Sequence, residues 1–237
     1  MGRRGAGRTA RDPLARPPVT LLRVLLLAFD TSTPAVTVAL HDGTQVLAVR
    51  AVVDARRHGE LLAPAIARVL ADANSSASDL TGIAVGVGPG PFTGLRIGLM
   101  TARAMGDALT IPVTGVCTLD VIAAAVVSAQ PFVVATDARR REVYWATYDA
   151  DGTRIDGPRV ERPADVEWRG PAYGAGALTY PEAFVDARRP EFPDAGVLAS
   201  MVATGRTAVL PPDPLYLRRP DAVEPSLRRP AAAVTPA

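Results

Sequence analysis

The sequence predicts an α/β fold of two lobes, in which the second lobe is reduced. Three observations lead to this prediction. Three strand-like apolar segments follow one another near the N-terminus, helical and strand-like patterns then alternate, and a second group of strands begins near residue 132. The chain has 237 residues, of which 48% are hydrophobic and 21% charged, so it can bury a sizeable core without disulfide bonds.

The first lobe is expected to begin with three strands. A strong hairpin signal, Asp42-Gly43, joins the second strand to the third. Apolar residues that recur at helical spacing then predict the first helix, in which Pro64 lies near the start. We expect strands at 24–30, 35–41, 45–53, 82–87 and 113–117, and helices at 59–73, 93–109 and 119–128.

The second lobe is expected to contain strands at 132–136 and 142–148, with a further hairpin at Asp151-Gly152. Beyond Ile155 the pattern weakens. Three strands joined by hairpins and followed by right-handed crossovers are typical of the ribonuclease-H-like lobe of the actin, Hsp70 and sugar-kinase superfamily. The predicted division is a disordered extension at 1–22, a first lobe at 23–118, a smaller lobe at 119–217 and a tail at 218–237.

Charge is distributed unevenly along the chain. Residues 1–23 hold six arginines and one aspartate, whereas the remaining residues carry 20 arginines against 23 acids. A basic, nucleic-acid-binding body is therefore not indicated. The sequence contains no lysine, which excludes both a Walker A lysine and a Schiff-base lysine.

Cysteine and histidine are scarce. The single cysteine, Cys117, excludes an internal disulfide and a cysteine-rich zinc site, and it suits a reducing cytoplasm. The two histidines, His41 and His58, are too far apart in sequence for a helical metal-binding pair. We therefore expect no metal site, and no apolar stretch is long enough to predict a membrane span.

Two loops could contact phosphate. The turn at Asp30, Thr31 and Ser32 ends a buried strand, and the segment with Gly88 and Gly90 leads from a strand into a helix. Backbone N–H groups and hydroxyls in such places suit anions, which would make this a vestigial nucleotide-binding turn. The alternative is that the turn caps its own backbone and that the glycines only allow tight packing.

The first two helices carry unusual faces. Residues on the first form a broad apolar stripe, and small residues on the second recur every four positions as a smooth ridge. A glycine inside a helix lowers stability by about 1 kcal/mol relative to alanine, so a row of glycines suggests that this face packs closely against another element. The faces could bind another chain or pack inside the lobe. They comprise Leu61, Leu62, Ile66 and Leu70, and Gly94, Gly98, Ala102 and Gly106.

The turn between the two strands of the second lobe contains Arg139, Arg140 and Arg141. Three arginines could hold a carboxylate or a phosphate. Without further information a solvated hairpin tip is the favoured explanation, and the sequence alone does not assign them a role.

Five segments in order resemble signatures of the TsaB (YeaZ) family, which serves tRNA threonylcarbamoyladenosine synthesis in bacteria. They read LAFDTST from Leu27, RHGELLAP from Arg57, GPGPFTGLRIG from Gly88, DARRREVY from Asp137 and PDPLYLR from Pro212. The resemblance covers about residues 24–219. The family pattern usually has serine where this chain has Gly59 and Pro91, which puts hydroxyl contacts at these two positions in doubt.

The resemblance implies an actin-like fold and a non-catalytic role. In this family the chain pairs with the catalytic subunit TsaD through the first two helices, TsaE joins the assembly, and TsaC makes the activated donor. It implies that ATP and metal belong to the partner subunits, that none is held by this chain, and that tRNA is contacted mainly through the complex. A homodimer of this chain alone is left open.

Two enzymatic readings compete with the accessory role. One is a glycoprotease-like peptidase, which would need His41 or His58 as its general base. The other is a stand-alone actin-like ATPase or kinase built on the Asp30 turn. A second lobe that looks short and rich in proline argues against a complete nucleotide pocket.

Overall fold

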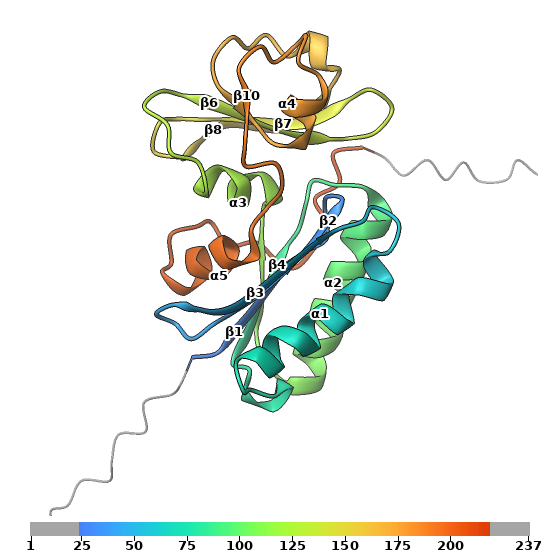
Figure 1. Cartoon of the computed structure of the whole chain (residues 1–237), viewed down its shortest axis with the longest axis vertical. Coiled ribbons are helices and arrows are strands. Elements are labelled where there is room, and N and C mark those ends of the chain that lie inside the picture. The colour runs from blue at the N-terminus through green and yellow to red at the C-terminus, as the bar shows by residue number, and fades with distance from the viewer. Residues whose placement is uncertain (1–23, 219–237) are drawn as a thin grey trace, which may run out of the picture.

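The computed structural model describes residues 24–218 as two lobes (Figure 1). Each lobe is built on a five-stranded sheet, with strand order β3-β2-β1-β4-β5 in the first and β10-β9-β6-β7-β8 in the second. This confirms the predicted two-lobed, actin-like α/β fold. The predicted extension at 1–22 and the tail after Arg218 lie outside the described residues.

The first lobe follows the predicted order of elements. Its strand β1 pairs antiparallel with β2 and parallel with β4. Every predicted strand and both long helices lie within two residues of their expected ends. The elements are β1 (Leu26–Asp30), β2 (Ala35–His41), β3 (Val46–Val53), α1 (His58–Asp72), the 3-10 turn η1 (Ala77–Asp79), β4 (Gly82–Gly86), α2 (Phe92–Leu109) and β5 (Val113–Val116).

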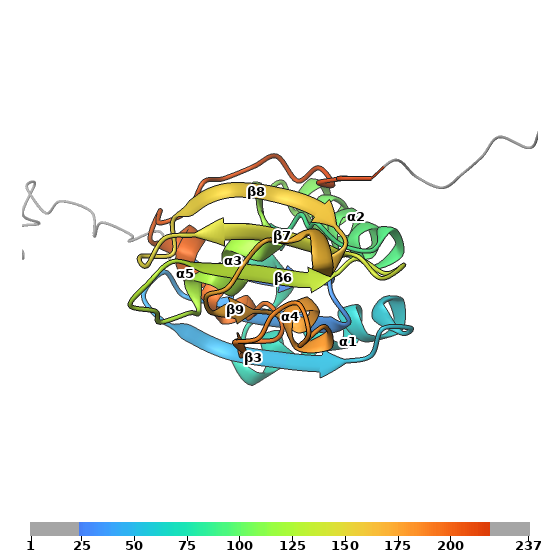
Figure 2. The same cartoon turned by 90° about the horizontal axis from the view of Figure 1, so that it is seen from above.

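The second lobe contains more elements than the sequence predicted. After α3 (Thr118–Ala124) come β6 (Phe132–Asp137), β7 (Val143–Tyr148), β8 (Arg154–Glu161), η2 (Pro163–Asp165), β9 (Ala172–Tyr173), α4 (Ala175–Thr179), β10 (Ala187–Arg188) and α5 (Ala195–Ala203). Seen from above, this sheet lies over the first lobe (Figure 2). Helix α3 is shorter than the predicted 119–128, because beyond Ala124 the chain leaves the sheet and Val127 is 97% exposed.

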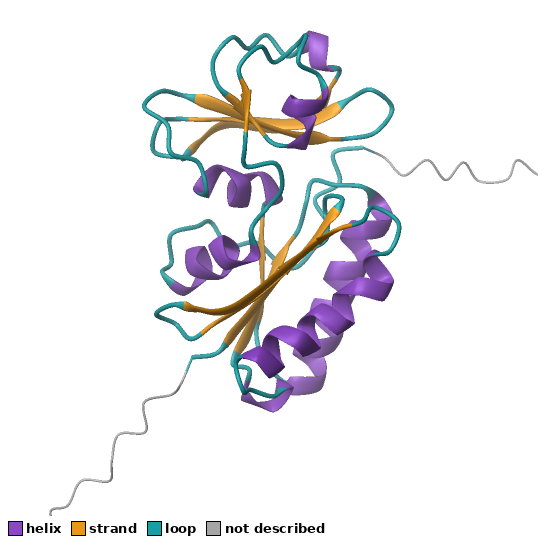
Figure 3. Cartoon of the chain, viewed as in Figure 1, coloured by secondary structure: helices purple, strands orange, loops and turns teal. Residues whose placement is uncertain are grey.

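Helices cover both faces of the first sheet (Figure 3). Helices α1 and α2 lie on one face, and α5 lies on the other, where Leu198 and Ala199 pack against Ala28 and Ala84. The predicted range 119–217 assigns α5 to the second lobe, but α5 packs mostly on the sheet of the first lobe and also contacts α3. None of the helices in residues 24–218 combines the length and apolarity needed to cross a membrane.

The final described residues, 210–218, form a strap between the lobes. Leu210 exchanges backbone hydrogen bonds of 2.8 and 2.9 Å with Gly115 of β5. At the other end of this C-terminal strap, Arg218 forms an ion pair with Glu142 of the second lobe. The strap therefore holds both lobes.

Candidate functional site

The Asp30 turn uses its polar groups internally. The Asp30 carboxylate accepts hydrogen bonds from the Ser32 backbone N–H at 2.6 Å and from the Thr118 hydroxyl at 2.6 Å. The Thr31 hydroxyl donates to the carbonyl of Gly94 at 2.7 Å. Asp30, Thr31 and Ser32 are all buried, so the structure favours the capping interpretation of this turn over a phosphate-binding one.

The glycine-rich loop closes directly onto the same turn. A Cβ atom at Gly86 would lie 1.8 Å from Asp30 Oδ2, and one at Gly90 would lie 2.2 Å from the Ser32 carbonyl oxygen. Gly88 adopts a φ of 89° and donates its N–H to the Thr118 hydroxyl at 3.1 Å. These glycines therefore allow close packing of the loop against the turn, which favours the packing interpretation over phosphate binding.

Burial raises the pKa of the Asp30 carboxyl above its ordinary value, and this effect outweighs the hydrogen bonds from Thr118 and Ser32, which lower it. The carboxyl is enclosed by the chain's own atoms. Among the described residues, no three histidine, cysteine or acidic side chains are grouped as a metal site would need.

A cavity of about 240 Å³ lies at the mouth of this turn, between the lobes. It is lined by Thr31, by Arg56 and His58 at the start of α1, by Thr93 at the start of α2, and by Arg139 of the second lobe. Its volume falls below the roughly 300–1,000 Å³ typical of small-molecule sites, so it is small for a whole nucleotide.

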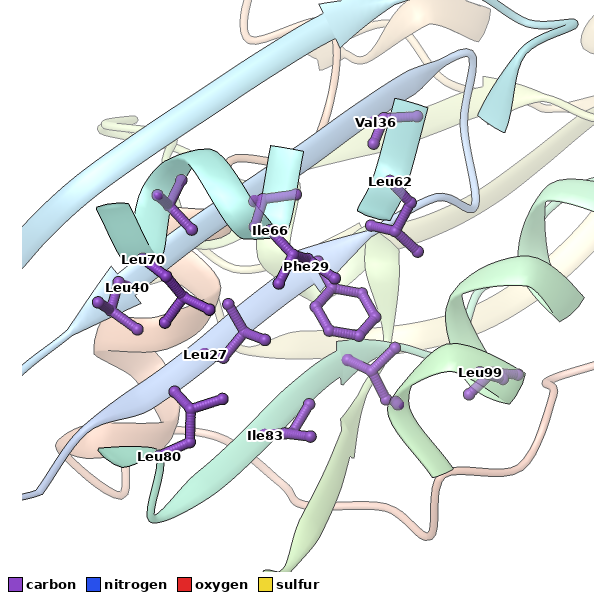
Figure 4. Close-up of a cluster of buried hydrophobic side chains, with 14 of the residues drawn as sticks. Leu27, Phe29, Val36, Leu40, Leu62, Ile66, Leu70, Leu80, Ile83 and Leu99 are labelled. Atoms are coloured by element: carbon purple, nitrogen blue, oxygen red, sulfur yellow. The ribbon is translucent and has the colours of Figure 1, made fainter. Parts of the chain in front are cut away.

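The apolar stripe of α1 belongs to the core. Leu62, Ile66 and Leu70 are at most 8% exposed and point toward Phe29 and Leu27 of β1 (Figure 4). This corrects the expectation that these residues form a partner interface, because helical periodicity reports that a face is buried but not which surface buries it. Leu61 is the one member of that set that is only partly buried, and it too packs against this core.

The ridge of α2 is also internal, which corrects the second half of the predicted interface. A Cβ at Gly94 would lie 2.4 Å from the Thr31 carbonyl oxygen, and one at Gly98 would lie 2.5 Å from the Thr31 hydroxyl. A Cβ at Gly106 would meet Val113 of β5 at 2.3 Å, and Ala102 is fully buried. The small residues let α2 approach its own sheet.

The outward surface of the two helices consists of other residues. Helices α1 and α2 lie side by side, and Ile97 bridges toward Gly59 at their N-terminal ends. On the outer side, Met100 is 60% exposed and Ala104 is exposed. The sequence analysis missed this surface, although an apolar methionine outside the buried ridge of α2 was a readable signal.

Neither histidine is arranged for nucleophilic catalysis. His41 accepts from the Gly43 N–H at 2.9 Å, and His58 Nε2 bonds the Thr33 carbonyl at 2.7 Å. Cys117 is buried, and burial raises the pKa of its thiol to about 12. No described hydroxyl or thiol nucleophile forms a hydrogen bond to either imidazole.

Comparisons with known proteins place the chain in a family. The family model for TsaD, tRNA N6-adenosine threonylcarbamoyltransferase, matches residues 51–211. An uncharacterized protein of Mycobacterium tuberculosis is 49% identical over 205 residues, covering 83% of this chain and 93% of that protein. The tRNA threonylcarbamoyladenosine biosynthesis protein TsaB of Escherichia coli is 37% identical over 134 residues, covering 55% of this chain and 57% of that protein.

A solved structure agrees over most of the fold. YeaZ from Pseudomonas aeruginosa superimposes with a TM-score of 0.71 at 30% sequence identity, covering 82% of this chain and 100% of that chain. Sequence and fold therefore point the same way, and the chain belongs to the TsaB (YeaZ) family.

Proposed function

We propose that this chain is the non-catalytic accessory subunit that pairs with a TsaD-type subunit during threonylcarbamoyl transfer to adenosine 37 of ANN-decoding tRNAs. Membership of the TsaB family supports a place in tRNA threonylcarbamoyladenosine synthesis. The closed Asp30 turn and the dispersed histidines support an accessory role, because they leave no evident catalytic centre in the described residues.

The observation that carries the pairing is the surface of α1 and α2. Two long helices cover one face of the first sheet, and their outward positions are rich in small side chains. In α2, Met100 and Ala104 are exposed and adjacent at helical spacing. Small side chains allow helices of another chain to approach closely, and methionine is enriched in protein interfaces.

The partner would bury this surface and hold its own lobes in a productive arrangement. In this proposal, ATP, metal and the reacting groups belong to the other subunits, with TsaE joining the assembly and TsaC supplying the activated donor. Most of the tRNA contact would come from the TsaD-type subunit.

Size-exclusion chromatography with the TsaD-type subunit of the same organism tests the pairing. Wild type should co-elute, and Met100→Asp with Ala104→Arg should abolish co-elution, because burying an unpaired charge costs several kcal/mol. Val127→Asp is the matched control, since Val127 is 97% exposed and lies on neither helix. Co-elution of the double variant at wild-type affinity would contradict this interface.

A further inference from the structure

We infer that the arginine-rich turn between β6 and β7, with the two cavities that border it, forms a binding band for RNA phosphates. This inference rests on the proposed function and deepens it. It assigns part of the tRNA contact to this chain, and it gives Arg139 and Arg141 a role that the sequence alone left open.

The first observation is that both cavities meet at one turn. The smaller one, between the lobes, is lined by Arg56 and Arg139. A groove of about 730 Å³ on the second lobe is lined by Arg141, Arg162 and Arg169. Because Arg139 and Arg141 stand in the turn of the same hairpin, the two hollows border that turn from either side.

The second observation is that four of these five arginines have no partner within residues 24–218, and the fifth, Arg139, is only loosely paired. Arg56, Arg141, Arg162 and Arg169 form no side-chain hydrogen bond or ion pair within residues 24–218, and Arg139 has one long contact, 3.8 Å, to Asp137. Elsewhere on this lobe, arginines are paired with acids. Examples are Arg159 with Asp156 at 2.8 Å and Arg188 with Asp186 at 2.7 Å.

Charge and shape favour a polyanion. Five arginines line the two cavities against two glutamates, Glu167 and Glu182, both in the larger groove. No acid lines the smaller cavity, where the first turns of α1 and α2 also favour negative charge. A single phosphate ion would occupy only one of these hollows. Arginines in both hollows suit the successive phosphates of a nucleic-acid backbone.

Arginine also suits this ligand chemically. Its planar guanidinium can bind two phosphate oxygens at once, and it stays charged at every physiological pH. Tyr180, which lines the larger groove, offers an aromatic ring on which an unpaired base could stack. The contacts position RNA and read no sequence, so discrimination among tRNAs would come from the partner subunit.

The test measures binding of an in vitro transcribed ANN-decoding tRNA to the complex with the TsaD-type subunit, by fluorescence anisotropy at several salt concentrations. The variant Arg141→Gln/Arg162→Gln/Arg169→Gln should bind about tenfold or more weakly near 0.1 M salt. The slope of log K against log salt should become shallower by about 2, since each lost phosphate contact removes roughly 0.7–0.9.

The control removes the same charge from the same lobe. Arg159→Gln/Arg188→Gln/Arg189→Gln takes away three arginines that are ion-paired with Asp156, Asp186 and Glu191. This variant should keep the affinity and the salt slope near those of the wild type. Equal losses in both triple variants would show a general charge effect and overturn the assigned band.

Pairing is measured first, so that the two hypotheses fail separately. If the groove variant co-elutes with the TsaD-type subunit but binds tRNA as wild type does, the band is wrong and the proposed function stands. If wild type does not pair, the proposed function fails, and binding is measured on this chain alone. RNA binding by the single chain that depends on these arginines would then support the band. Absence of such binding would overturn it. Inorganic phosphate that binds the groove while tRNA does not would also overturn it.

Discussion

Asp30 is a carboxyl group that the fold encloses completely. Burial raises its pKa above the ordinary value of 3.8, so the native state holds the proton more tightly than the unfolded chain does. The contribution of this group to stability is therefore full below the unfolded pKa and is lost as the pH rises through the native pKa.

An Asp30→Asn variant should reveal this linkage. The free energy of unfolding of wild type minus that of the variant should fall as the pH is raised from about 4, because only the wild type must then bury a charge. Urea titrations of both proteins across the pH range measure the difference. A difference that stays constant or grows with pH would show that Asp30 is not buried as described.

Glycine positions in the two long helices should respond in opposite ways to the same substitution. Gly94→Ala should destabilise the fold by about 2 kcal/mol, because its Cβ would collide with the Thr31 carbonyl oxygen. Gly59→Ala should stabilise it by about 0.5 kcal/mol, since its Cβ meets only Ile97 at 3.8 Å. Chemical denaturation compares the two, and a neutral Gly94→Ala would contradict the close approach of α2 to the Asp30 turn.

At the scale of elements, the C-terminal strap holds the lobes through partly buried leucines. Leu215 packs against the cores of both lobes, and its N–H donates to the Val87 carbonyl at 2.9 Å. Leu215→Asp should cost about 2–4 kcal/mol of unfolding free energy, because it places a charge between the two cores. Val209→Asp, at a position 64% exposed just before the strap, should change stability by less than about 0.5 kcal/mol. Equal effects would mean that the strap is not packed.

The elements of the first lobe were predictable because each has a clear local pattern. Strand β2 is a short, mostly apolar run bounded by turns, and the apolar residues of α1 recur at helical spacing. Helix α5 was not predictable in this way. Its nine residues, from Ala195, are nearly all small or apolar, so no polar face marks a helical period. Strands β9 and β10 have two residues each, too few for any pattern.

The candidate site was predictable only in part. The sequence identified α1 and α2 as the unusual helices, but it pointed to Leu62 and Gly98, which pack inside the lobe. A pattern of apolar or small residues shows that a helix face is buried. It does not show whether the same chain or another chain buries that face. The sequence also could not predict that Arg162 and Arg169 line the groove, because their position depends on the path of the chain after β8.

At the scale of the whole molecule, the features fall on different surfaces. The first lobe offers the outer side of α1 and α2, and the turn between β6 and β7 brings Arg139 beside the start of both helices. A partner that reaches the N-terminal ends of the helices would lie next to Arg139. The arrangement supports a subunit that binds a catalytic partner and shares its RNA substrate.

The most direct measurement is threonylcarbamoyladenosine formation on an ANN-decoding tRNA, reconstituted from the TsaC-, TsaD- and TsaE-type proteins of the same organism. Adding wild-type chain should raise product formation from background to multiple turnovers, and adding Met100→Asp/Ala104→Arg should leave it near background. Full product formation without this chain would contradict the proposed accessory role.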